Sequence, residues 1–199
     1  MKTKPLTFLL ALTFIFLFSG SSVVFGDDFQ DGLDAYGRGD YKTAYKLWLP
    51  LAEQGHTYAQ YNLGVVYANG QGVPQDYKEA VRWYRLSAEQ GFAHAQTNLG
   101  LMYSNGTGVP QDYKEAVRWY RLSAEQGDAS AQKNLGVMYA KGTGVLQDYA
   151  LAHMWFNLSG SQENKGIAFN RNRDKVEKEM SPQQMEEAQE MARNWKPKK

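Results

Sequence analysis

The chain has 199 residues, of which 14% are aromatic, so it has the length of about one domain and enough apolar side chains for a core. Its formal net charge is +1 at pH 7, which gives no reason to expect nucleic acid or an anionic membrane surface as a partner. It contains no cysteine, which excludes disulfides and thiolate metal sites.

The first 26 residues predict a secretory signal peptide. Two lysines precede an apolar run, residues 6–18, and small residues follow up to Gly26. The alternative is an uncleaved membrane anchor, because residues 5–26 carry no charge and are just long enough to cross a bilayer. Since the strongly apolar part is short, we expect cleavage near Gly26 and an exported protein, with the membrane contacted only through this segment if it is kept.

The remainder of the chain is organised around a repeated unit. The stretch Ala59–Gly91 is written again 36 residues later, as Ala95–Gly127. A third version begins at Ala131, and a more divergent one, Asp40–Gly55, precedes them. Self-similarity at such a period predicts a solenoid in which each unit buries its apolar face only against its neighbours.

We therefore predict an all-α fold, an α/α superhelical solenoid of helix pairs with capping helices at the C-terminal end. The expected divisions are a signal peptide (1–26), an N-terminal capping helix pair (27–55), three repeats (56–91, 92–127 and 128–163), and C-terminal capping helices with a tail (164–199).

Each full unit predicts two helices joined by a glycine-rich loop. Ala59, Leu63 and Val66 have the spacing of one buried helical stripe. The loop, residues 69–74, contains two glycines and a proline that end this helix, and Asp76 is a good N-cap for the next.

Two kinds of core residue recur in register. Trp83, Trp119 and Trp155 predict buried core side chains, each covering the next unit, and not a stacking platform for sugars or bases. A mid-helix glycine such as Gly64 costs about 1 kcal/mol relative to alanine. Because it recurs in the next two units, we expect another helix backbone to approach it.

The two ends depart from the repeat. Pro50 lies inside a helix of the first pair, which is more tolerable in a terminal unit than in a central one. Residues 167–180 predict a charged helix, and Ser181 followed by Pro182 predicts the start of another. Residues 196–199 are expected to form a frayed tail.

The unit carries half of the tetratricopeptide signature, in Leu63-Gly64-x-x-Tyr67 and Ala80-x-x-x-Tyr84. It departs from that family because Gln60 occupies the signature tryptophan position and the loop carries G-x-G-V. With the patterns A-x-x-Q/N-L-G-x-x-Y, G-x-G-V-x-x-D and A-x-x-W-Y/F, residues 28–162 resemble the Sel1-like repeat. This resemblance implies an adaptor for other proteins, often in bacterial envelope regulation, surface biogenesis or host contact. Together with the signal segment, it leads us to expect a periplasmic or secreted bacterial protein.

Comparison of the second and third units locates candidate binding residues. Residues 73–91 are repeated unchanged as 109–127, so all the differences lie in the first helix and its flanks. Differing positions 58, 61 and 65 are three and four residues apart and form one stripe beside the buried one. Over the three units the stripe contains Tyr58, Tyr61, Val65, His94, Thr97, Leu101, Ser130, Lys133 and Val137.

The first helix of each pair usually lines the concave groove of a two-helix solenoid. We therefore expect this ladder of aromatic, small and basic side chains to bind another protein or a peptide segment. The alternative is neutral divergence on a solvated face after a recent duplication.

Nothing in the sequence indicates catalysis, a cofactor or a metal. His56, His94 and His153 occupy different repeat positions, so we expect isolated surface or edge histidines instead of zinc ligands. The glycine loops follow helices and lack G-x-G-x-x-G, which favours turns over phosphate cradles. The acids recur with the repeat as caps and surface charges, whereas catalysis needs singular residues.

These observations favour a non-catalytic scaffold over two alternatives. One is an enzyme acting on cell-wall or β-lactam substrates, since some exported cysteine-rich Sel1-like proteins are linked to penicillin binding. Those relatives carry a disulfide in each repeat, and this chain has no cysteine. The other is a peptidoglycan-binding protein, which would need exposed aromatic residues.

Overall fold

The computed structural model describes residues 25–162 and 167–198, and these residues contain helices and no strand. The helices are α1 (Phe25–Gly37), α2 (Tyr41–Glu53), α3 (Thr57–Asn69), α4 (Tyr77–Glu89), α5 (Ala93–Asn105), α6 (Tyr113–Glu125), α7 (Ala129–Lys141), α8 (Tyr149–Gln162), α9 (Ile167–Glu177) and α10 (Pro182–Asn194). The predicted signal segment lies outside the described residues except for Phe25 and Gly26, which begin α1. Of the helices just named, none is both long and apolar enough to cross a bilayer.

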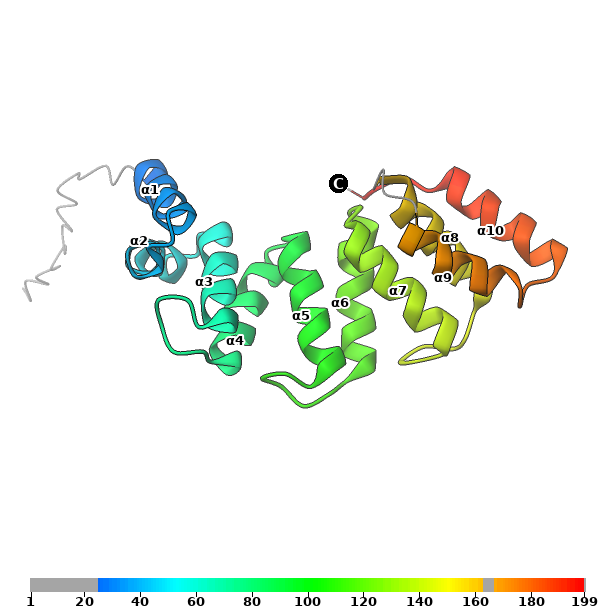
Figure 1. The fold of residues 1–199 in the computed structure, drawn as a ribbon, viewed down its shortest axis with the longest axis horizontal. Helices are drawn as coiled ribbons and strands as arrows, with labels where there is room; N and C mark the ends of the chain where they lie inside the picture. Colours follow the sequence, from blue (N-terminus) through cyan, green and yellow to red (C-terminus); the bar gives the residue numbers. More distant parts are fainter. Residues whose placement is uncertain (1–24, 163–166, 199) are drawn as a thin grey trace, which may run out of the picture.

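Helices α1 to α9 pack in chain order, each against the next, and α10 folds back onto α8. Figure 1 shows the pairs arranged along a shallow arc. The tight turns between pairs lie on the side facing the centre of the arc, called the inner side below, and the glycine loops lie on the outer side. This arrangement confirms the predicted all-α solenoid of helix pairs with C-terminal capping helices.

The local signals that start and end the helices act as expected. Asp76 caps α4, because its Oδ1 accepts hydrogen bonds from the backbone N–H groups of Lys78 (2.9 Å) and Glu79 (3.1 Å). In the loop before it, Gly72 has a φ of 78°, and a Cβ there would overlap the backbone of Tyr41 in the preceding pair. The loops therefore pack against neighbouring units.

The repeated tryptophans are buried as predicted, but they point the other way along the solenoid. Trp83 is 2% exposed and belongs to the apolar cluster that contains Trp48 and Leu63. Trp119 likewise packs in the cluster of Tyr84 in the preceding pair. Each tryptophan thus covers the unit before it, and the expectation that it covers the next unit is wrong.

The repeated mid-helix glycines lie closer to an aromatic ring than to the backbone of the paired helix. A Cβ on Gly100 would lie 2.8 Å from Cδ1 and Cε1 of Tyr120, and 3.3 Å from the carbonyl oxygen of Ala116. Gly136 stands in the same relation to Phe156. The predicted close approach exists, but its main cause is the ring of the paired helix.

Helices α9 and α10 close the C-terminal end. Val176 of α9 is buried beside Phe156. Ser181 and Gln184 form a reciprocal capping box at the start of α10, as the sequence indicated. The apolar side of α10 packs against the fold through Ala188, which is fully buried.

The C-terminal tail packs against the fold through Lys198 and is not frayed up to that residue. Its backbone N–H donates to the carbonyl oxygen of Glu125 at 2.7 Å, and its Nζ lies 2.8 Å from Oε2 of the same residue. Just before it, Trp195 packs edge to face against Trp155, with ring centroids 6.4 Å apart. The tail therefore runs back from α10 to the C-terminal end of α6, and the prediction of a frayed tail is wrong for these residues.

Candidate functional site

Three of the predicted binding residues stand in the first turns of α3, α5 and α7. Tyr58 is 54% exposed, the His94 side chain is 64% exposed, and Ser130 is also exposed. These three helices begin at the tight turns between pairs, which lie on the inner side of the arc (Figure 1). The first position of the stripe is therefore presented to solvent on that side in all three repeats.

An aromatic cluster joins these positions across units. The ring of Phe92, the N-cap residue of α5, lies 5.0 Å from Tyr58, 5.0 Å from Tyr61 and 5.4 Å from His94, centroid to centroid. Phe29 of α1 extends the cluster to Tyr58 at 6.2 Å. Burial raises the pKa of the Tyr61 hydroxyl, which agrees with its half-buried position in the cluster.

Phe92 was missed in the sequence analysis, although a signal was present. It corresponds to His56 of the preceding unit and is therefore one of the differing positions. It falls outside the stripe because it precedes α5, where helical spacing does not apply.

Tyr58 and His94 line one groove of about 450 Å³. This aromatic groove is formed by Thr57, Tyr58, Gln90, Gly91, Phe92, Ala93, His94 and Gln126. Its polar wall is fixed by hydrogen bonds, since Nε2 of Gln90 donates to the carbonyl of Gly55 at 3.1 Å and to Oε1 of Gln60 at 2.7 Å. The groove is thus held open by contacts between two neighbouring units.

The imidazole of His94 is oriented by the next unit. Its Nδ1 lies 2.9 Å from Oδ2 of Asp128, which also caps α7 by accepting from the backbone N–H of Ala131 at 2.7 Å. The hydroxyl of Thr97 lies 3.1 Å from Oδ1 of Asp128 and 2.7 Å from Oγ of Ser123. Thr97 is only 9% exposed, so its hydroxyl holds the Asp128 carboxylate in place and is not available to a partner.

The remaining members of the stripe differ in exposure. Leu101 is 46% exposed, whereas Val65 is half-buried against the core of its own unit. Lys133 is also half-buried. Val137 packs in the cluster of Val176, so the C-terminal cap covers the last position. The first position of the predicted ladder is therefore exposed in each unit, whereas the later positions are mostly half-buried or buried, with Leu101 as the exception.

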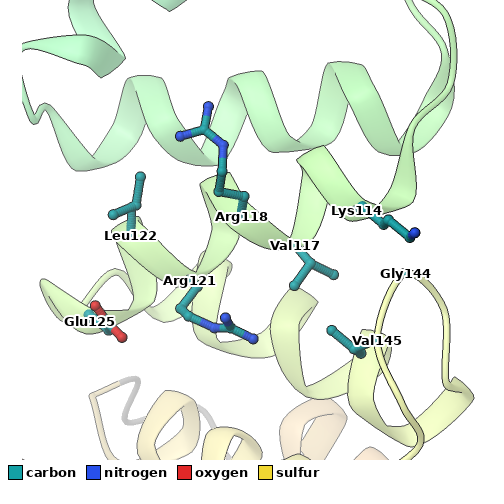
Figure 2. A pocket seen from close by; sticks show the side chains of 8 residues that line it. All are labelled: Lys114, Val117, Arg118, Arg121, Leu122, Glu125, Gly144 and Val145. Carbon is teal, nitrogen blue, oxygen red and sulfur yellow. The ribbon is translucent and has the colours of Figure 1, made fainter.

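A second groove, of about 350 Å³, lies beside α6 (Figure 2) and is lined by Lys114, Val117, Arg118, Arg121, Leu122, Glu125, Gly144 and Val145. In Figure 2, Val145 from the glycine loop faces Val117, while Arg118 points away from them.

Two of the cations in this second groove are already engaged within the fold. Arg118 pairs with Glu115 at 3.1 Å and lies 4.0 Å above the ring of Trp119. Nη2 of Arg121 donates to the hydroxyl of Tyr139 at 2.7 Å. Both arginines are therefore held by contacts within the fold.

The histidines do not converge. His56 caps α3 through Nδ1, which accepts from the backbone N–H of Ala59 at 3.2 Å. His153 is 3% exposed, with Nε2 at 3.0 Å from Oε1 of Glu177, so the expectation of a surface or edge position is wrong for this residue. In the part of the chain that the structure describes, no group of three or more His, Asp or Glu residues is placed to hold a metal ion.

Comparison with known proteins identifies the repeat family from which this solenoid is built. The model of the Sel1 repeat matches residues 29–56, 57–92, 93–128 and 129–164. No curated protein matches the chain.

Two solved structures are similar to it. One is a protective antigen present in uropathogenic Escherichia coli strains, displaying an SLR fold; it is 43% identical, with a TM-score of 0.67, over 70% of this chain and 31% of that one. A Sel1 repeat protein from Oxalobacter formigenes is 34% identical, with a TM-score of 0.68, over 74% of this chain and 59% of that one. The match thus spans less than two thirds of either protein. Four consecutive repeat matches cover more than half of the sequence, and the chain belongs to the Sel1 repeat family.

Proposed function

We propose that the chain is a non-catalytic scaffold that binds a segment of another protein along the inner side of its arc. Sel1 repeats generally mediate protein–protein interaction, and the family fold is generally a non-catalytic scaffold. The observation that carries the proposal for this chain is the aromatic groove, in which Tyr58, Phe92 and His94 from two units surround one opening.

The groove has the physical properties of a binding site. Aromatic side chains are enriched among the residues that contribute most to binding energy at protein interfaces. The hydrogen bonds of Gln90 and of His94 are already made in the unbound chain, so a partner orders few additional groups when it binds. Association then retains most of the free energy gained by covering Tyr58.

We also propose that the scaffold acts outside the bacterial cytoplasm. The composition of residues 1–26 supports export to the periplasm or the medium. The similarity to an antigen of uropathogenic Escherichia coli supports a role in the cell envelope or in host contact. Mass spectrometry of the protein recovered from cells tests this, because export with cleavage gives an N-terminus near Asp27, whereas a full-length N-terminus in the membrane fraction would indicate an anchor.

The binding site is tested by affinity capture from envelope extract followed by mass spectrometry. The variant Tyr58→Ala/Tyr61→Ala should lose the specifically captured partner, with an affinity loss of roughly thirtyfold or more if these residues form the centre of the interface. The matched control is Tyr77→Ala/Tyr113→Ala, because Tyr77 and Tyr113 are exposed by 40% and 39% but begin α4 and α6, after the glycine loops. Equal capture by both double variants, with helical circular dichroism unchanged, would refute this location.

A further inference from the structure

The chain already holds one basic segment against its own inner side. Lys198 bonds to Glu125 twice, through its backbone N–H to the carbonyl oxygen and through its Nζ to the carboxylate. These two residues, together with Gly91 and Gln126, border a hollow of about 430 Å³. Gly91 and Gln126 also line the aromatic groove, so the hollow and the groove lie next to each other.

The site that receives Lys198 is repeated in the solenoid. Helices α4 and α6 have identical sequences, and each ends on a glutamate, Glu89 in α4 and Glu125 in α6. The last carbonyl groups of a helix have no intrahelical partner, and the helix dipole is negative there, so both features favour a cation. Glu89 is exposed, and the described residues supply no hydrogen bond or ion pair to its side chain.

We propose that the inner side of the solenoid binds an extended, lysine-bearing segment of the partner, and that residues 196–198 act as an internal ligand at the Glu125 position. This inference rests on the proposed function and specifies the chemistry of the partner. The contacts of Lys198 define the recognition: a backbone N–H bonds to the helix carbonyl in any extended peptide, and an ammonium group bonds to the carboxylate.

The charge of the surroundings agrees with this assignment. Glu53 ends α2 in the same sequence context as Glu89 and Glu125, followed by glutamine and glycine. Asp128 adds a carboxylate after the next of these turns, but its side chain is 8% exposed and is bonded to His94 and Thr97, so the exposed glutamates carry the argument. An acidic segment would meet like charges at each of these turns, whereas a basic one meets a carboxylate at every repeat.

The experiment uses the full chain and a fluorescent peptide with the sequence of residues 195–199, Trp-Lys-Pro-Lys-Lys, followed by fluorescence anisotropy. A matched peptide carries glutamate in place of each lysine. The lysine peptide should bind at least fivefold more tightly, with the difference shrinking as salt is added. Glu89→Gln should weaken binding of the lysine peptide about threefold, and Glu186→Gln, at an exposed position of α10, should leave its affinity unchanged.

The variant Lys198→Ala tests the internal ligand separately. The variant removes the ammonium contact and leaves the backbone N–H bond, so the tail should hold the Glu125 carboxylate less well and more lysine peptide should bind per chain than in the unaltered protein. Equal binding of the two peptides, or no effect of either Glu89→Gln or Lys198→Ala, would overturn this inference. If partner capture still depends on Tyr58 in that case, only the assigned chemistry of the partner is wrong; if it does not, the proposed function fails as well.

Discussion

Replacing Gly100 by alanine should destabilise the protein, although the same change in an open helix is stabilising. An alanine gains about 1 kcal/mol over glycine in a helix interior. Here the new Cβ would lie 2.8 Å from two ring atoms of Tyr120, a residue that is 2% exposed and cannot withdraw without opening the core. Overpacking of this kind costs about 1–3 kcal/mol, so the expected net loss is up to about 2 kcal/mol.

The assay is urea unfolding followed by circular dichroism. Gly37→Ala is the control, because a Cβ there meets nothing within 4 Å. In a Tyr120→Ala background the ring is absent, and Gly100→Ala should then stabilise by up to about 1 kcal/mol, since only the carbonyl oxygen of Ala116, 3.3 Å away, still limits the new Cβ. If Gly100→Ala raises the free energy of unfolding equally with and without the Tyr120 ring, the proposed contact does not constrain this position.

The remaining predictions concern the C-terminal cap and alkaline pH. His153→Ala should lower the free energy of unfolding by about 2 kcal/mol and speed hydrogen exchange in α9, because it leaves a cavity and removes one of the two partners of Glu177, the other being Arg173. Unchanged exchange in α9 would contradict this role. Burial raises the pKa of Tyr120 from 10.0 to about 12, so its stabilising contribution is complete below pH 10 and is lost as the pH rises towards 12. Tyr120→Phe should reduce this alkaline loss in urea titrations at several pH values, since Phe156 shows that phenylalanine fits the equivalent position; an identical loss in the variant would refute the assignment.

The repeat made the overall architecture predictable from the sequence. A unit that recurs with the same glycine, cap and tryptophan must fold in the same way each time, so one helix pair determines the others. The direction in which Trp83 points was not predictable in the same way. Periodicity identifies which side chains are buried, but both neighbouring units are equally near in the sequence pattern, and packing alone selects between them.

The candidate site was predictable only at its exposed positions. Tyr58 and His94 are exposed, because they lie in the first turns of their helices, and their role in binding stays a prediction. The burial of Thr97 could not be predicted in this way. Thr97 bonds to Asp128, which belongs to the following unit, whereas helical spacing describes only contacts within one unit. The contact between Lys198 and Glu125 joins residues 73 positions apart and lies outside the repeat register, so no local pattern could indicate it.

The most direct test of the binding surface is photo-crosslinking in the cells that make the protein. A benzophenone-bearing phenylalanine analogue replaces Tyr58 on the inner side in one variant and Tyr77, which follows a glycine loop, in another. We predict a discrete adduct with a second polypeptide from position 58 and none from position 77. An adduct that forms only from position 77, or from both positions equally, would contradict a partner held on the inner side of the solenoid.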